Sequence, residues 1–326
     1  MTTYKLCSNF AELLERYIQR KIDQKHLENN YRTNASIFDK WCLKNYPEAK
    51  VIDKDLAWNY FMSAKDLSSQ YQHIKACFIR QFAKFLLDEK IDAYVLPTSI
   101  ERRVDHMPPH IITMEEIVRF FEATEKLMKL KASHLKATRF SLPPLFLTML
   151  TLGLRPTEAL RVKIDDVDLD SGKVFIRESK GWAQRFVIMK DSTLEQCRTY
   201  NEIISNIFPK RQAFFAFKDG GFITHKYMHW WFSKIWDFAQ LPRPAGERCS
   251  PYSFRHSFAV HRLNQWSKEG ADVEAMLDRL SLFMGHINIA HTAYYLHFEQ
   301  SYYVELENKM SLSNKAVLPK VVDYDK

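Results

Sequence analysis

Apolar side chains recur at intervals of three and four residues along the first part of the chain, which places them on one face of an α-helix. The pattern predicts four helices, over residues 10–25, 31–46, 53–64 and 68–90. The fourth is the most regular, with an apolar stripe made of Ile74, Phe78, Phe82, Phe85 and Leu86. Lys75, Arg80 and Lys84 fall outside this stripe and are expected to be solvated, with contact to a polyanion as the alternative.

The helical pattern stops at residues 96–110, where LPTSIERRVDHMPPH contains three prolines and the adjacent Arg102 and Arg103. Proline interrupts helices and keeps a chain extended, so this stretch is expected to be a linker. Thr113 and Glu116 then have the spacing of a capping box, which predicts that another helix begins there. The sequence therefore divides into a helical domain over residues 1–96, a linker over 97–110, a second domain over 111–310 and a tail over 311–326.

The second domain combines helical and strand patterns. Residues 143–152 are strongly apolar and predict a buried helix that ends at a turn containing Gly153. Residues 167–189 contain two turn sequences between β-prone runs, which predicts a three-stranded antiparallel meander. Further helices are expected over residues 193–207, 224–239, 256–266 and 271–284, with Trp230, Trp231 and Trp236 as packing residues. The predicted fold class is mainly α with a small antiparallel β-sheet.

Composition and charge restrict the partners. The 326 residues, 46% of them hydrophobic, are enough for two domains, and the net charge of +8 favours a polyanion, either nucleic acid or an anionic membrane. No run of about 18 apolar residues exists, and the first residues lack the layout of a signal peptide, so a cytoplasmic protein without a membrane partner is expected. The five cysteines are scattered without metal-ligand spacing, and no metal is expected.

Candidate chemistry gathers near the carboxyl end, in the segment LFMGHINIAHTAYYLH at residues 282–297. It contains the pair Gly285 and His286 and, about two helical turns later, the adjacent Tyr294 and Tyr295. A tyrosine hydroxyl loses its proton only near pH ~10. As a nucleophile it therefore needs neighbours that remove the proton and stabilise the developing charge.

Three upstream motifs supply charged residues. Arg155 follows a glycine-containing turn in TLGLRPTEALR, Lys180 lies in a turn of ESKGWAQRF, and Arg255 lies in SPYSFRHSFA. Together with the Gly-His pair and a tyrosine nine residues beyond that histidine, these motifs resemble the tyrosine recombinases, also called the phage integrase family. The resemblance covers the second domain well and the amino-terminal third only in general style.

The resemblance implies a site-specific recombinase that cuts and rejoins double-stranded DNA through a 3′-phosphotyrosyl link, without ATP or a metal cofactor. Arg155 and Arg255 would neutralise the two non-bridging phosphate oxygens, and Lys180 would protonate the leaving 5′ oxygen. His286 would donate a hydrogen bond to the phosphate or orient the tyrosine. Tyr295 would be the nucleophile.

Four neighbours of these residues complete the expected site. Tyr294 is the rival nucleophile, since adjacent helical residues point about 100° apart and only one can face the phosphate. Glu158 is expected to support the arginine turn. Tyr252, a further candidate catalytic residue, stands three residues before Arg255, where the family commonly has histidine. Its phenol can hydrogen-bond a phosphate oxygen but is a much weaker base than imidazole. His256 matches a position that is usually a buried structural histidine in the family.

The resemblance also implies a homo-tetramer on two DNA partners, in which the tail after Tyr295 packs against a neighbouring subunit, with a directionality factor as a further partner. The alternatives are a DNA-binding accessory protein that does not cut, a type IB topoisomerase, and a basic helical protein without a nucleic-acid role. Basic residues expected either to contact DNA or to lie on solvated loops are Arg102, Arg103, Lys131, Lys136, Arg243 and Arg248.

Overall fold

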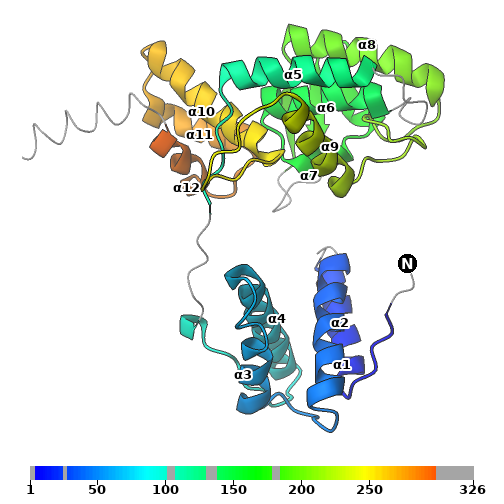
Figure 1. Cartoon of the computed structure of the whole chain (residues 1–326), viewed down its shortest axis with the longest axis vertical. Coiled ribbons are helices and arrows are strands. Elements are labelled where there is room, and N and C mark those ends of the chain that lie inside the picture. Colours follow the sequence, from blue (N-terminus) through cyan, green and yellow to red (C-terminus); the bar gives the residue numbers. More distant parts are fainter. Residues whose placement is uncertain (1–3, 25–27, 101–106, 130–137, 178–183, 299–326) are drawn as a thin grey trace, which may run out of the picture. The chain divides into compact units, whose positions relative to one another are not determined.

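The computed structural model describes residues 4–24, 28–100, 107–129, 138–177 and 184–298 of the 326-residue chain (Figure 1). The chain divides into two compact units, Met1–His106 and Met107–Lys326, and each has a hydrophobic core of its own. Helices dominate both, and the described strands form one small antiparallel sheet. The predicted fold class is thus confirmed.

The first unit is built from four helices followed by a short 3₁₀ turn. Asp53 caps the third helix by accepting a hydrogen bond from the amide of Leu56 at 2.7 Å, and Ser68 caps the fourth through the amide of Tyr71. The elements are α1 (Ala11–Asp23), α2 (Glu28–Asn45), α3 (Lys54–Met62), α4 (Ser69–Asp88) and η1 (Thr98–Ile100).

Aromatic rings fill the core of this unit. The ring of the fully buried Phe38 meets Tyr60 edge to face, with 5.0 Å between centroids. The predicted apolar stripe of α4 is buried at Phe78, Phe82, Phe85 and Leu86. Its first member, Ile74, is 39% exposed, so the stripe begins one turn later than predicted.

Two basic residues of α4 that were expected to be solvated are buried. Lys75 Nζ donates to the hydroxyl of Ser63 at 2.7 Å and lies 4.6 Å from the centroid of the Tyr60 ring. Arg80 Nε donates to the carbonyl of Leu96 at 2.8 Å. The prediction was wrong for both because neighbouring segments of the unit offer each cation oxygen atoms or an aromatic face.

The second unit consists of a short antiparallel sheet and the helices around it. Its helices are α5 (Met114–Lys129), α6 (Thr138–Leu152), α7 (Pro156–Arg161), η3 (Ile164–Asp166), α8 (Asp191–Ile207), α9 (His225–Phe238), α10 (Tyr252–Lys268), α11 (Val273–Met284), α12 (Ala290–Ala293) and η4 (Tyr294–Phe298). Its strands are β1 (Val167–Asp168), β2 (Lys173–Ile176) and β3 (Arg185–Ile188), paired in the order β1-β2-β3. This is the predicted meander.

Helix α6 lies in the core of the second unit and packs against α5, α8 and α10. It buries Leu142, Leu145, Phe146, Met149 and Leu152, and then ends at Gly153. The predicted packing role of the tryptophans holds for Trp231 and Trp236, which are buried, but not for Trp230, which is 50% exposed. Trp230 lies one residue before a buried position, where a helical residue faces about 100° away.

Residues at the end of the predicted linker pair with the second unit. The amide of His110 donates to the carbonyl of Arg248, and the amide of Arg248 donates to the carbonyl of Pro108. The predicted capping box is present, since Thr113 and Glu116 exchange side-chain to backbone hydrogen bonds at 2.8 and 3.2 Å. Among the helices of the described ranges, none combines the length and apolar character needed to cross a bilayer.

Candidate active site

Arg155 is held at the start of α7 by the turn that follows α6. Gly153 has φ of +60°, a left-handed conformation that lets the chain turn sharply after the buried helix. The Arg155 amide donates to Glu158 Oε2 at 3.0 Å, and its guanidinium donates to Glu158 Oε1 at 2.6 Å. A further guanidinium nitrogen, Nη2, donates to the carbonyl of Gly285 at 2.7 Å. The first arginine is therefore tied to the Gly-His motif.

Arg255 lies in the first turn of α10 and is 1% exposed. Its Nη1 donates to the carbonyl of Gly153 at 2.6 Å, and its Nη2 donates to the carbonyl of Met284 at 2.8 Å. Each guanidinium thus binds backbone oxygens of another motif, which brings three distant stretches of the chain to one place. The predicted helix over residues 256–266 begins earlier, at Tyr252.

Glu158 joins these groups beneath the site. It accepts hydrogen bonds from Arg155 and from both terminal nitrogens of Arg185, and Arg255 Nη1 lies 3.9 Å from its Oε2. Burial alone would raise the pKa of Glu158, but the hydrogen bond and charge of Arg185, followed by the charge of Arg255, lower it to about 2. The carboxylate therefore stays charged and fixes the positions of the arginines.

Arg185 is a site residue that the sequence reasoning missed. It opens β3, and its Nε donates to the carbonyl of Phe283 at 2.7 Å, so that it links the sheet to the end of α11. A signal was available, because this arginine lies five residues after Lys180 in the same predicted hairpin. Lys180 itself lies outside the described residues.

Tyr295 is 3% exposed, and its hydroxyl lies 3.0 Å from His256 Nδ1. Burial raises the pKa of this hydroxyl to about 12, although the charge of Arg255 acts in the opposite direction. Tyr294 is 40% exposed, and its ring centroid is 5.8 Å from that of Tyr295. The contact with His256 distinguishes the buried tyrosine from its neighbour.

His286 follows the left-handed Gly285 at the end of α11. Its Nδ1 lies 2.7 Å from the hydroxyl of Thr292, and its ring lies parallel to that of Tyr295 with 6.3 Å between centroids. Burial lowers the pKa of His286 to about 3, helped by the charges of Arg255 and Arg155. The imidazole is therefore neutral at pH 7.

These side chains surround an open cavity of about 450 Å³. One lining residue, Tyr252, was expected at the site, and another, His291, was not. Tyr252 is 38% exposed and has its ring 5.2 Å from that of His256, and His291, which the sequence reasoning did not single out, lies 6.0 Å from the His286 ring. The described residues that line it are Arg155, Tyr252, Arg255, His256, His286, Ile287, Ala290, His291, Tyr294 and Tyr295.

Two of the candidate DNA-binding residues are among the described residues. Arg243 pairs with Asp237 at 2.9 Å, and Arg248 is exposed. Neither lines the cavity. The other four candidates fall outside the described residues: Arg102, Arg103, Lys131 and Lys136.

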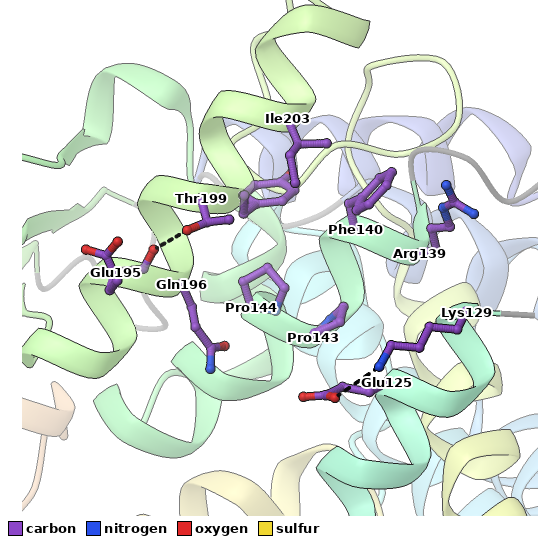
Figure 2. A pocket seen from close by; sticks show the side chains of 11 residues that line it. Glu125, Lys129, Arg139, Phe140, Pro143, Pro144, Glu195, Gln196, Thr199 and Ile203 are labelled. Atoms are coloured by element: carbon purple, nitrogen blue, oxygen red, sulfur yellow. Dashed lines mark hydrogen bonds and ion pairs between the residues drawn. The ribbon is translucent and has the colours of Figure 1, made fainter.

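A second cavity, of about 580 Å³, lies where α5, α6 and α8 meet (Figure 2). Its walls are largely apolar, with Pro143 and Pro144 on one side and an ion pair between Glu125 and Lys129 at its edge. None of the described residues lines both this cavity and the one around Tyr295. Among the described residues, no three His, Cys, Asp or Glu side chains are grouped as around a metal ion.

Relatives of known sequence match more than half of this chain. An integrase/recombinase of Sinorhizobium fredii, y4rE, is 31% identical over 198 residues, which is 58% of this chain and 60% of that protein's length. The tyrosine recombinase XerD of Staphylococcus haemolyticus is 29% identical over 240 residues, covering 71% of this chain and 72% of its own.

Solved structures share the fold. The XerH site-specific recombinase in its post-cleavage complex with palindromic difH substrate has a TM-score of 0.66 at 21% identity, covering 94% of this chain and 85% of its own. A lambda integrase dimer bound to a COC′ core site has a TM-score of 0.62 at 12% identity, covering 87% of this chain and 94% of its own. The model of the phage integrase family matches residues 110–301. The chain therefore belongs to the phage integrase family.

Proposed function

We propose that this protein is a tyrosine-type site-specific DNA recombinase, which cuts and rejoins DNA strands through a 3′-phosphotyrosyl intermediate. The observation that carries the proposal is the convergence of two guanidinium groups and a tyrosine on one cavity, from motifs far apart in the chain. Family membership and relatives named as recombinases support it.

The two arginines suit the binding of a backbone phosphate. Arg155 and Arg255 line the cavity side by side, and each presents planar N–H donors that match phosphate oxygens. Burial lowers the pKa of Arg255 to about 10, with the charge of Arg155 acting in the same direction, so the group remains a cation at neutral pH. Their role is to neutralise the charge that develops on the non-bridging oxygens.

The remaining groups have separate roles as hydrogen-bond donor, acid and nucleophile. With Nδ1 of His286 accepting from Thr292, its neutral ring carries a proton on Nε2 and donates it as a hydrogen bond to a phosphate oxygen. Lys180 is proposed as the acid that protonates the leaving 5′ oxygen. Tyr295 attacks the phosphorus, and the phosphotyrosyl bond keeps the free energy of the cut bond, so rejoining needs no ATP.

The proposed partner is double-stranded DNA carrying a specific site, bound by a homo-tetramer with a directionality factor. The net charge of +8 favours a polyanion. The structurally similar XerH and lambda integrase proteins were solved in complexes with a difH substrate and a core site. We extend that mode of binding to this chain.

The test is formation of a covalent protein–DNA adduct. Duplexes that bind the protein are first selected from a random-sequence pool. A nick is then placed near the cut site, so that the short fragment with the free 5′ hydroxyl diffuses away after cleavage. We expect the wild type and Tyr294→Phe to form an adduct that survives denaturing electrophoresis, and Tyr295→Phe to form none. An adduct that persists in Tyr295→Phe and disappears in Tyr294→Phe would move the nucleophile by one residue.

Two further outcomes separate the alternatives. DNA binding without any adduct in the wild type would favour an accessory protein that does not cut. Relaxation of supercoiled DNA without exchange of strands between two duplexes would favour a topoisomerase. A recombinase is expected to form the adduct and to exchange strands.

A further inference from the structure

We propose that His256 is a catalytic residue, which accepts the hydroxyl proton of Tyr295 as that tyrosine attacks the phosphate. The inference rests on the proposed strand-transfer function and adds a proton acceptor to it. Its basis is the direct contact of 3.0 Å between His256 Nδ1 and Tyr295 Oη. That distance is within the reach required of a general base.

The position of His256 on α10 suits this role. It follows Arg255, whose guanidinium lies in the same cavity, so one helical turn carries both a phosphate-binding cation and a proton acceptor. Tyr252 lies four residues earlier on the same helix face and also lines the cavity. A phenol is a poor base near pH 7, so the imidazole one turn further along supplies what Tyr252 cannot.

The charge state of His256 allows it to accept a proton. Burial, followed by the charges of Arg255 and Arg248, lowers the pKa of His256 to about 4, and the ring is therefore neutral at pH 7. For Nδ1 to accept from Tyr295, the ring proton must lie on Nε2. A bound phosphate adds negative charge beside Arg255, which offsets part of that depression and makes the imidazole more basic when DNA is in place.

The proton and electron pairs balance in both directions. In cleavage, the Tyr295 proton moves to His256, the Oη–P bond forms and the bond from phosphorus to the 5′ oxygen breaks, while that oxygen takes a proton from the proposed acid, Lys180. In rejoining, the incoming 5′ hydroxyl returns its proton to the lysine and attacks phosphorus. The departing Tyr295 oxygen then recovers its proton from His256.

The experiment combines His256→Ala with a tyrosine analogue whose hydroxyl loses its proton at lower pH. In the full-length protein, Tyr295 is replaced by a fluorinated tyrosine of lower pKa, and the single-turnover rate of adduct formation is measured on the nicked duplex. With natural tyrosine, we expect His256→Ala to slow the adduct by about 10²–10⁴-fold. With fluorinated tyrosine, the loss should be at least tenfold smaller, since the hydroxyl ionises more readily.

Controls separate proton transfer from structure. His256→Asn keeps a hydrogen-bond acceptor near Nδ1 without a basic nitrogen, and it should lose as much rate as His256→Ala. Arg155→Lys should lose the same factor with either tyrosine, because its defect lies in binding the phosphate. DNA affinity, measured by gel shift, should be unchanged in both His256 variants.

Three outcomes would overturn the role of His256: an unchanged rate in His256→Ala, full activity in His256→Asn, or an equal loss with both tyrosines. Each of these requires a wild type that forms the Tyr295 adduct. The absence of that adduct would instead count against the proposed function. The two failures are thereby distinguished.

Discussion

At the scale of single residues, Glu158 holds the arginines of the site together although it is not among the described residues that line the cavity. Its side chain is fully buried and contacts Arg155 and Arg185, with Arg255 at 3.9 Å. Three cations in a region of low dielectric would repel one another without it. The carboxylate thus allows the guanidinium groups of Arg155 and Arg255, which are proposed to bind phosphate, to lie close together.

We expect Glu158→Gln to lower the free energy of unfolding by about 3–5 kcal/mol at pH 7, because it leaves buried cations without their counter-charge. The folded-state pKa of Glu158 is about 2, below its ordinary 4.5. A lowered pKa stabilises the fold above pH 4.5, and that stabilisation is lost as the pH falls toward 2. Urea unfolding of both proteins should therefore show a difference that narrows between pH 5 and pH 3.

The matched control is Glu15→Gln, which removes an exposed ion pair between Glu15 and Arg32 in the first unit. Exposed pairs contribute about 0–1 kcal/mol, so little change is expected at either pH. A difference for Glu158→Gln that stays constant with pH, or that matches the control, would contradict the assigned role.

The site residues that could be predicted from the sequence lie in local motifs, whereas those that could not are defined by contacts with distant segments. Arg155, Arg255 and Tyr295 stand in recognisable motifs, and the structure brings all three to one cavity. The partners of Arg185 and His256 lie on distant segments, 27 and 39 residues away, so the hairpin position of Arg185 marks a candidate residue without revealing its contacts. The same limit applies to Lys75 and Arg80, whose partners lie on other segments of the first unit.

At the scale of elements, tight turns position the arginines. Gly285 ends α11 with φ of +66°, and a Cβ there would lie 2.7 Å from Arg185 Nη1. Arg185 cannot simply swing aside, because its guanidinium is bonded to Glu158 and to the carbonyl of Phe283. A side chain at this turn would therefore disturb the ion pairs under the site as well as the backbone.

We expect Gly285→Ala to cost more stability than Gly270→Ala, measured by urea unfolding. Gly270 follows α10 with φ of +75°, and a Cβ there would have nothing within 4 Å. Gly270→Ala should cost only the left-handed strain, about 1–2 kcal/mol. Gly285→Ala should add the loss of the Arg185 contacts, about 1–3 kcal/mol more, and should slow adduct formation. Equal costs for the two variants would show that Arg185 moves freely.

Elements with strong local signals were predicted well. The capping box at Thr113 and the apolar run of α6 each determine structure within a few residues of chain. The start of α10 was placed four residues too late, because its first turn buries the polar Ser253 and Arg255 on either side of Phe254. Buried polar residues interrupt the apolar periodicity from which a helix start is predicted.

At the scale of the whole molecule, every described residue that lines the proposed site belongs to the second unit. The segment that enters this unit is bound tightly to it. His110 contacts Glu116 and Glu247, and the amide of Ile112 donates to the hydroxyl of Ser257 at 2.8 Å. The described core residues of this unit, and the described residues that line the site, all come after residue 107.

We expect a fragment of residues 107–326 to fold by itself with one cooperative transition, followed by circular dichroism in urea. A fragment of residues 114–326 lacks His110 and the fully buried Ile112. It should be less stable by about 2–4 kcal/mol, from the lost apolar burial and hydrogen bonds. Failure of the longer fragment to fold, or equal stability of the two, would contradict this division of the chain.

The exchange of backbone contacts between the arginine motifs has a consequence for biosynthesis. Arg155 is completed by a carbonyl 130 residues further along the chain, and Arg255 by one 29 residues further along. A ribosome that has made both arginines has therefore not yet made the carbonyls of Met284 and Gly285 that bind them, nor Tyr295. A nascent or prematurely terminated product that stops before residue 284 carries both arginines without these contacts, and its site is incomplete.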